Sequence, residues 1–197
     1  MVNLVESVGT LRERKKAATR QSLHEAALRL AVADGLDSVT VEDIADEVGV
    51  SRRTFSNYFA NKEDAVLHAD RERARTLLDL VRTRPASEKP WRALRQSLAE
   101  MYGAMMTPRD PVWVAQLRLL RRHPTLLARQ AADQIELERE LAEILLARGA
   151  SDAALARLMA ATFLAATRTA GNLWLESGGE QPMPELVDRL LDRIRFH

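Results

Sequence analysis

The chain has 197 residues with a formal net charge of +1, and 29% of its residues are charged, as is usual for a soluble protein. A chain of this length suits one or two domains and can bury a hydrophobic core. The absence of cysteine excludes disulfides, thiolate metal sites and cysteine nucleophiles, and it is compatible with a reducing cytoplasm.

Helix-forming residues dominate the sequence, and no stretch alternates between apolar and polar residues with the period of a β-strand. We therefore predict an all-α fold of about nine helices. Met1–Thr10 lacks the basic start and apolar core of a secretory signal. The longest uncharged apolar run, residues 158–167, is too short to cross a bilayer, so we expect a cytoplasmic protein without a membrane span.

Residues 11–33 form the first predicted helix, with an apolar stripe at helical spacing and Gly35 beyond its end. Its first half carries five basic residues against Glu13 alone: Arg12, Arg14, Lys15, Lys16 and Arg20. Such a charge run is often only the solvated face of a helix. Beside the segment that follows, we interpret it as a basic arm in which Arg12, Arg14 and Lys15 contact DNA phosphates.

A pair of short helices joined by a tight turn comes next. Thr40 is a suitable N-cap for a helix over 41–48, whose apolar residues recur at helical spacing. Gly49 ends that helix, because glycine adopts the left-handed conformation that the turn requires. Ser51 caps a second helix over 52–58. This arrangement is that of a helix-turn-helix, whose second helix enters the major groove of DNA.

The second short helix carries side chains that suit DNA. Arginine can pair with guanine and asparagine with adenine, while serine, threonine and tyrosine suit phosphates. Lys62 begins the following helix, where its ammonium and the free amides could hold a phosphate. We therefore predict DNA contacts from nine residues of this segment: Thr40, Ser51, Arg52, Arg53, Thr54, Ser56, Asn57, Tyr58 and Lys62. The competing interpretation is that this helix pair is ordinary packing.

The segment Gly35–Val66 resembles the DNA-binding part of the TetR (tetracycline-repressor) family of bacterial transcriptional regulators. The resemblance rests on these groups of residues: Thr40, Ile44-Ala45, Gly49-Val50-Ser51, Thr54-Phe55, Tyr58-Phe59 and Lys62-Glu63. With the preceding helix it covers residues 11–66. It implies a helix-turn-helix domain with a basic arm over 1–60, and a helical ligand-binding and dimerisation domain over 61–197.

In the second domain the pattern predicts one helix from 62 to about 82, a linker over 85–90, and further helices over 91–105, 112–122, 124–147, 153–176 and from 184 onward. In the helix over 124–147 we expect Ala131 and Ile135 to be buried. The helix over 153–176 is apolar almost all round, with small residues suited to close approach by another helix: Ala153, Ala156, Ala160 and Gly171. Together with the last helix it predicts a four-helix interface in a homodimer, as in the family.

Candidate ligand contacts are the methionine and aromatic residues of the second domain, which can adapt to apolar ligands: Met101, Tyr102, Met105, Trp113 and Trp174. Arg168 lies in the most apolar stretch, where a buried arginine needs a carboxylate or an acidic ligand. The competing interpretations are plain core packing for the first group and a structural ion pair for Arg168.

The sequence shows no nucleophile with its base and no glycine-rich phosphate loop, and its four histidines suggest no metal site. We therefore expect no enzyme, no cofactor and no metal. The predicted function is a dimeric transcriptional repressor that binds a palindromic DNA operator and is released by a small, largely apolar effector. The alternative is a helical ligand- or protein-binding module whose helix-turn-helix is purely structural.

Overall fold

A computed structural model of the protein describes residues 10–105 and 111–196, apart from the side chains of 104–105 and 111–113. These two ranges contain ten helices and no strand, which confirms the predicted all-α fold. The chain divides into two compact units, Met1–Ala69 and Asp70–His197. The division between these units follows Ala69, and the domain boundary that we predict from the sequence follows residue 60.

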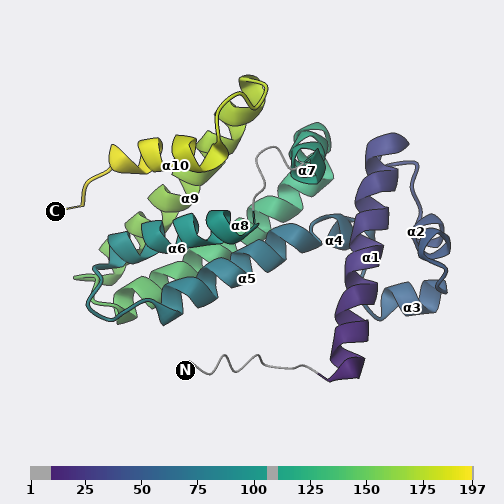
Figure 1. Ribbon diagram of the computed structural model, residues 1–197, viewed down its shortest axis with the longest axis horizontal. Coiled ribbons are helices and arrows are strands. Elements are labelled where there is room, and N and C mark those ends of the chain that lie inside the picture. The colour runs from purple at the N-terminus through teal and green to yellow at the C-terminus, as the bar shows by residue number, and fades with distance from the viewer. Residues whose placement is uncertain (1–9, 106–110, 197) are drawn as a thin grey trace, which may run out of the picture. The chain divides into compact units, whose positions relative to one another are not determined.

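The first unit contains four complete helices: α1 (Leu11–Ala33), α2 (Val41–Val48), α3 (Arg52–Ser56) and α4 (Lys62–Val66). Both α2 and α4 pack against α1, and α3 packs against α2 (Figure 1). The bounds of α1 and α2 are those that the sequence predicts. The helix α3 is shorter than predicted, so Tyr58 lies in the turn after it. The helix predicted from residue 62 is interrupted at Leu67 and resumes as α5 (His68–Thr83).

A buried core holds the four helices of the first unit together. Its apolar members come from every helix and from the intervening turns: Leu23, Ala27, Leu36, Ile44, Phe55, Phe59 and Val66. Two buried histidines complete it. The His24 Nδ1–H donates to the Ala65 carbonyl oxygen at 2.8 Å, and the His24 ring meets the His68 ring edge-on, with 5.7 Å between centroids. These rings join α1 to the segment in which α4 ends and α5 begins.

The turn between α2 and α3 is determined locally. Thr40 and Asp43 form a reciprocal capping box at the start of α2, in which each side chain accepts from the other residue's backbone N–H. The Thr40 hydroxyl, and next the Thr40 backbone N–H, donate to the Asp43 carboxyl and hold its pKa below its ordinary value. Gly49 ends α2 with φ of 73°, in the left-handed region that favours glycine.

Replacing Gly49 with alanine should lower the free energy of unfolding by about 1–2 kcal/mol, because an L-residue is strained in that conformation. A Cβ at Gly49 would meet no atom within 4 Å, so the cost comes from the backbone alone. Gly49→Asn should lose less, since asparagine tolerates the left-handed region better. Urea unfolding followed by circular dichroism measures the free energies of unfolding, which should decrease from the parent to Gly49→Asn to Gly49→Ala. Equal stability of Gly49→Ala and the parent would contradict the proposed backbone strain.

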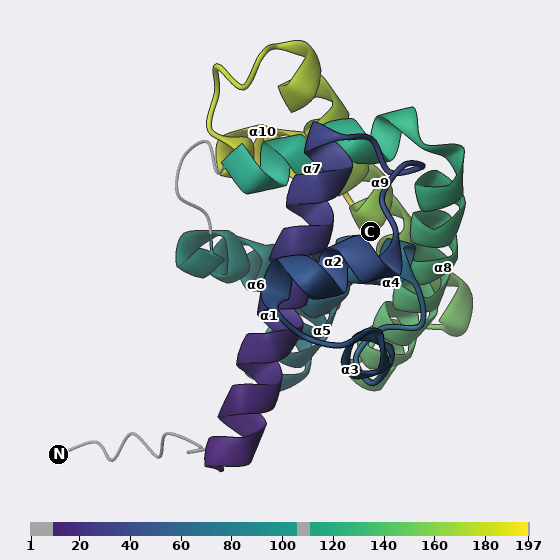
Figure 2. The same cartoon turned by 90° about the vertical axis from the view of Figure 1, so that its right-hand side faces the viewer.

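The second unit contains most of α5 and five further helices: α6 (Pro90–Met105), α7 (Pro111–Arg122), α8 (Pro124–Ala147), α9 (Ala153–Glu176) and α10 (Met183–Asp192). The long helix α9 packs against α8 and α10, and α6 contacts both of those helices (Figure 2). At the centre lie fully buried side chains such as Leu94, Leu141 and Phe163. The Arg95 guanidinium ties α6 to α10 through Asp188 and Asp192, at 2.6 and 2.7 Å.

The structure reverses the predicted orientation of α9. Of the four small residues named above, Ala153 is exposed, and Ala156, Ala160 and Gly171 are buried within the unit, where the Gly171 position faces Met183 of α10. Their face of the helix is therefore already covered by the same chain. The apolar side chains left in solvent are different ones, with Leu158 of α9 56% exposed and Ile135 of α8 71% exposed. The expected burial of Ile135 and Ala131 is thus wrong for the single chain.

Candidate nucleic-acid interface

The helix α3 is fixed by one buried side and by its first turn. Phe55 on the helix and Phe59 just beyond it are 1% and 7% exposed, with 5.8 Å between their ring centroids. At the start, the Ser51 hydroxyl accepts from the Thr54 N–H at 3.1 Å and hydrogen-bonds the Thr54 hydroxyl at 2.9 Å. The predicted contacts Ser51 and Thr54 therefore already have a capping role, which fixes where the helix begins.

The polar side of α3 faces away from this core. Six of the predicted DNA contacts lie on α3 or in the turn after it. Four of them are exposed, namely Arg52, Arg53, Ser56 and Asn57, and two are half-buried, namely Thr54 and Tyr58. The structure thus places a set of hydrogen-bond donors on one short, anchored helix and the turn after it. Such side chains can reach base edges and phosphates in a major groove. Thr40, at the start of α2, is also exposed, although its hydroxyl is engaged with Asp43.

The two arginines of α3 differ in their surroundings. The Arg52 Nη1 lies 2.8 Å from the Glu42 Oε1 on α2, so its charge has an internal partner. The Arg53 side chain forms no ion pair or hydrogen bond with any residue that the structure describes, and it is exposed. The Arg53 guanidinium is therefore the better placed of the two to bind an external acceptor such as a guanine edge.

The basic arm occupies the first turns of α1. Arg12, Arg14 and Lys15 are all exposed there, and α1 begins with a capping box between Thr10 and Glu13. Their charges stay in solvent, as phosphate contacts require, and none of them lies on α3 itself. They remain candidates for contacts outside the groove.

Lys62 begins α4, as predicted, and its side chain has partners within the first unit. Its ammonium donates to the backbone carbonyl oxygens of Leu36 and Val39, both at 2.7 Å. These bonds tie the start of α4 to the loop between α1 and α2. Because those two carbonyls take up two of its three N–H donors, Lys62 has an internal bracing role, and its phosphate contact stays a prediction.

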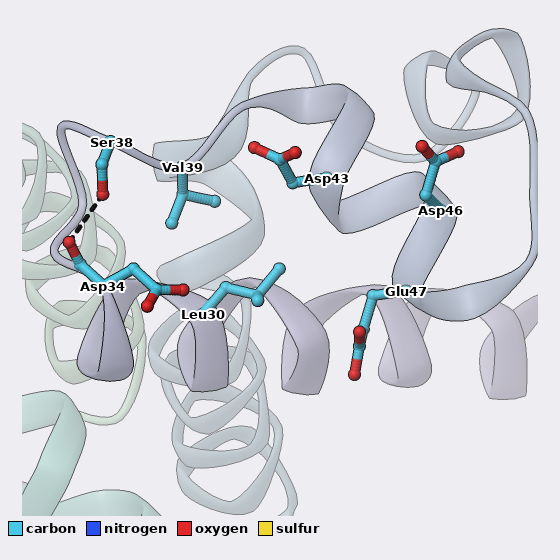
Figure 3. Close-up of a pocket in the computed structure, with 7 residues that line it drawn as sticks. All are labelled: Leu30, Asp34, Ser38, Val39, Asp43, Asp46 and Glu47. Atoms are coloured by element: carbon cyan, nitrogen blue, oxygen red, sulfur yellow. Dashed lines mark hydrogen bonds between the residues drawn. The ribbon is translucent and has the colours of Figure 1, made fainter.

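A pocket in the first unit lies on the acidic side of α2 (Figure 3). The end of α1, the loop after it and α2 line this pocket. Its carboxylates belong to Asp34, Asp43, Asp46 and Glu47. Glu47 also pairs with Arg29 at 2.7 Å. The sign of this charge is wrong for a phosphate backbone, so the pocket marks a side of the unit that does not suit DNA.

The described residues contain no group of three or more His, Asp or Glu side chains that could hold a metal ion. In the same part of the chain, no helix is both long and apolar enough to cross a membrane.

Comparison with known proteins identifies the two units. Residues 23–69 match the family of bacterial regulatory proteins called tetR, and residues 88–196 match the MftR C-terminal domain. The chain is also 33% identical over 172 residues to the HTH-type transcriptional regulator TcmR of Streptomyces glaucescens, which covers 83% of this chain and 76% of that protein. The chain belongs to the TetR family. The protein is therefore a helix-turn-helix transcriptional regulator, which confirms the resemblance noted in Gly35–Val66.

Solved structures of TetR-family proteins share the fold. One is a FadR repressor of Thermus thermophilus in complex with lauroyl-CoA, with a TM-score of 0.58 and 23% identity, covering 90% of this chain and 97% of that one. Another is NalD of Pseudomonas aeruginosa, described as the secondary repressor of the MexAB-OprM efflux pump, with a TM-score of 0.61 and 18% identity, covering 91% and 95%. At these identities the likeness establishes the fold.

In this TetR-family chain, the predicted ligand contacts of the second unit separate into groups. Met101 is 7% exposed and belongs to the core, and Tyr102 is half-buried beside it. Burial raises the pKa of the Tyr102 phenol to about 12, an effect that the nearby Arg73 charge partly offsets. The side chains of Met105 and Trp113 lie outside the described residues.

Trp174 is buried in the core, which is the competing interpretation given for it above, whereas Arg168 is exposed and not buried as expected. The Trp174 Nε1–H donates to the Gln181 carbonyl oxygen at 2.7 Å, and a Cβ at Gly179 would lie 2.9 Å from its ring. Trp174 is therefore a core residue that fixes the turn between α9 and α10. Arg168 is exposed, because its face of α9 is open to solvent in the single chain. Its Nη1 donates to the Gln134 Oε1 at 3.3 Å.

Sequence reasoning missed a polar cluster in the second unit. Arg73 of α5 donates to the Oε1 of the buried Gln116 at 3.2 Å and forms an ion pair with Asp70. The signal was available, since Gln116 is an isolated polar residue in the apolar pattern of α7. The cluster adds hydrogen-bonding groups to a region whose other candidate contacts are apolar.

Replacing Lys62 with methionine, which keeps the stem and removes the ammonium, should lower the free energy of unfolding by about 1–3 kcal/mol. Two backbone carbonyl oxygens lose their charged donor in that variant. DNA binding by the folded variant should keep the salt dependence of the parent. The exposed Lys89 provides a control, since Lys89→Met should change neither quantity. A reduced salt slope with unchanged stability in Lys62→Met would restore the phosphate assignment.

Proposed function

We propose that this TetR-family regulator is a homodimeric repressor that binds a palindromic operator through α3 of each protomer. A small-molecule effector bound in the second unit releases it from DNA. The observation that carries the proposal is the exposed, unpaired Arg53 on a helix whose opposite side is anchored by Phe55. The Arg53 side chain can therefore bind a base edge without breaking an ion pair or hydrogen bond to another described residue.

Recognition by so short a helix needs two copies. The helix α3 has five residues and offers few base contacts, so one protomer could specify only a short half-site. Two heads related by a two-fold axis read a palindrome, with half-site centres about 34–36 Å apart, or a multiple of that distance. A regulator that binds chromosomal DNA in this way works in the bacterial cytoplasm.

The dimer contact that we propose uses the outward face of α9 and the adjoining α8. Leu158 and Ile135 are the most exposed large apolar residues of the second unit. The contact between Arg168 and Gln134 shows that the exposed sides of α9 and α8 adjoin each other. Covering these side chains with a second copy would remove apolar surface from water, which is the main driving force of association.

The effector site that we propose lies near Met101 and Tyr102, and the charge of Arg73, which donates to Gln116, acts on the Tyr102 phenol. These residues suit a largely apolar molecule that carries at least one hydrogen-bonding group. The FadR structure from Thermus thermophilus holds lauroyl-CoA, and that protein and NalD are both described as repressors, which supports a repressor with an apolar effector here. By linkage, the effector must bind the DNA-incompatible state more tightly, and operator DNA must weaken effector binding by the same factor.

Replacing Arg53 with alanine should weaken operator binding by about 1–3 kcal/mol and relax the preference at one base position in each half-site. The matched control is Arg29→Ala, because Arg29 is also an exposed arginine of the first unit but pairs with Glu47. It should bind like the parent. Gel shifts with the DNA flanking the protein's own gene, in a salt series, measure both variants.

The same gel shifts separate this function from the alternative. A regulator gives a discrete shift that depends on the DNA sequence, whereas a module with a purely structural helix-turn-helix gives only salt-labile smearing. If Arg53→Ala bound that DNA as tightly and as selectively as the parent at matched salt, α3 would not be the reading element.

Leu158→Glu should convert the dimer into monomers, because it places a charge at the centre of the proposed apolar contact. Light scattering after size-exclusion chromatography measures the mass. The control is Val32→Glu, which changes an exposed apolar residue of the first unit that is 49% accessible. That variant should stay dimeric. A Leu158→Glu protein that remained a dimer would place the interface elsewhere.

A further inference from the structure

Arg20 of α1 has an unusual environment for an arginine of the first unit. Its Cζ lies 5.9 Å from the centroid of the Tyr58 ring, within the range of a cation–π contact. Its side chain is half-buried, and its Nε is fully buried without a hydrogen-bond partner among the described residues. The Tyr58 ring thus holds the Arg20 guanidinium in place, and the Arg20 Nε–H has no hydrogen-bond acceptor among the described residues.

Other arginines of the same unit show the contrast. Arg29 lies 2.7 Å from a Glu47 oxygen, and Arg52 lies 2.8 Å from a Glu42 oxygen. Arg20 has no such carboxylate within the described part of the chain. A half-buried cation without a counter-charge is costly, and the tyrosine ring supplies only part of the compensation. An external anion would supply the rest.

The position of Arg20 on α1 indicates which anion. Arg12, Lys16 and Arg20 follow one another at intervals of four residues, so they lie on one face of the helix with a rise of about 6 Å at each step. Arg12 and Lys16 are exposed, and the row ends beside Tyr58, in the turn that follows α3. A series of cations that leads to a DNA-reading helix suits the evenly spaced phosphates of one DNA strand.

We propose that Arg20, positioned by the Tyr58 ring, binds a phosphate of the DNA backbone and so fixes α1 and α3 together on the duplex. The planar guanidinium fork suits a phosphate, and the Arg12–Lys16–Arg20 row extends the contact along the same strand. The contact carries no base information; it sets the depth and angle at which α3 enters the groove. This inference rests on the proposed docking of α3.

The test uses the full-length protein, four single variants and two double variants. The single variants are Arg20→Gln, Arg20→Lys, Tyr58→Phe and Tyr58→Leu, and the double variants combine Arg20→Lys with each Tyr58 change. Fluorescence anisotropy measures binding across a salt series to a duplex from upstream of the protein's own gene and to a scrambled duplex of the same composition. Arg20→Gln should weaken binding to both duplexes by the same factor and reduce the salt slope by about 0.9 for each protomer. Arg20→Lys keeps the charge, so it should keep the slope and lose about two- to fivefold in affinity.

The Tyr58 variants test the positioning. In Tyr58→Leu the further change Arg20→Lys should have no added effect, because the ring that orients the guanidinium is gone. In Tyr58→Phe the ring remains, so Arg20→Lys should cost as much as it does in the parent. If Arg20→Lys weakened DNA binding as much in the Tyr58→Leu background as in the parent, the proposed coupling between Arg20 and the Tyr58 ring would be wrong.

A control variant and thermal unfolding separate this role from a structural one. Arg29→Gln removes the same charge from the same helix but from an internal ion pair, and it should leave the salt slope unchanged. If Arg20→Gln lowered only the melting temperature and not the slope, Arg20 would be a packing residue and the inference would fail. If the Arg20 variants bound normally while Arg53→Ala lost its sequence preference, only this inference would fail. If Arg53→Ala also bound normally, the docking of α3 would fail with it.

Discussion

The structure of the first unit depends on anchoring a helix that is too short to be stable by itself. Isolated helices shorter than about 12–15 residues are marginal in water, and α3 has five. Its stability comes from burial of Phe55 and Phe59, from the Ser51 cap and from the left-handed turn at Gly49. Because all of these act on one side or at one end, the backbone of α3 is held in place while its opposite side stays open to solvent. A helix that contacts DNA needs both properties, since a backbone that had to become ordered on binding would lose conformational entropy.

Ion pairs within the first unit decide which of its cations are free to contact DNA. Arg29 and Arg52 pair with glutamates, and the Lys62 ammonium donates to backbone carbonyls. Residues of α1 and α2 also line an acidic pocket. Arg53 and Arg20 are left without carboxylate partners among the described residues. The net charge of +1 is therefore unevenly distributed, and we expect the unpaired cations of α1 and α3 to supply the electrostatic attraction to phosphate.

Local signals in the sequence were enough to predict the helix-turn-helix, and long-range ones were not. Helical periodicity, the Thr40 cap and Gly49 act within a few residues of each other, so the bounds of α1, α2 and the turn can be read from local sequence. The role of Lys62 depends on carbonyls more than twenty residues away, and the pairing of Arg52 with Glu42 depends on how α3 folds back on α2. In α9 nearly every face is apolar, so periodicity could not tell which face α8 and α10 cover. That is why Arg168 was expected inside and lies outside.

The most direct test of the account is methylation interference on the DNA that this TetR-family regulator protects. Guanine N7 lies in the major groove and adenine N3 in the minor groove, so the two modifications report which groove the protein reads. If α3 docks as proposed, methylated guanine N7 should block binding at symmetric positions in two half-sites about one helical turn apart, or a multiple of it. Interference from adenine N3 alone, or at a single unpaired site, would contradict a dimer that reads the major groove with α3.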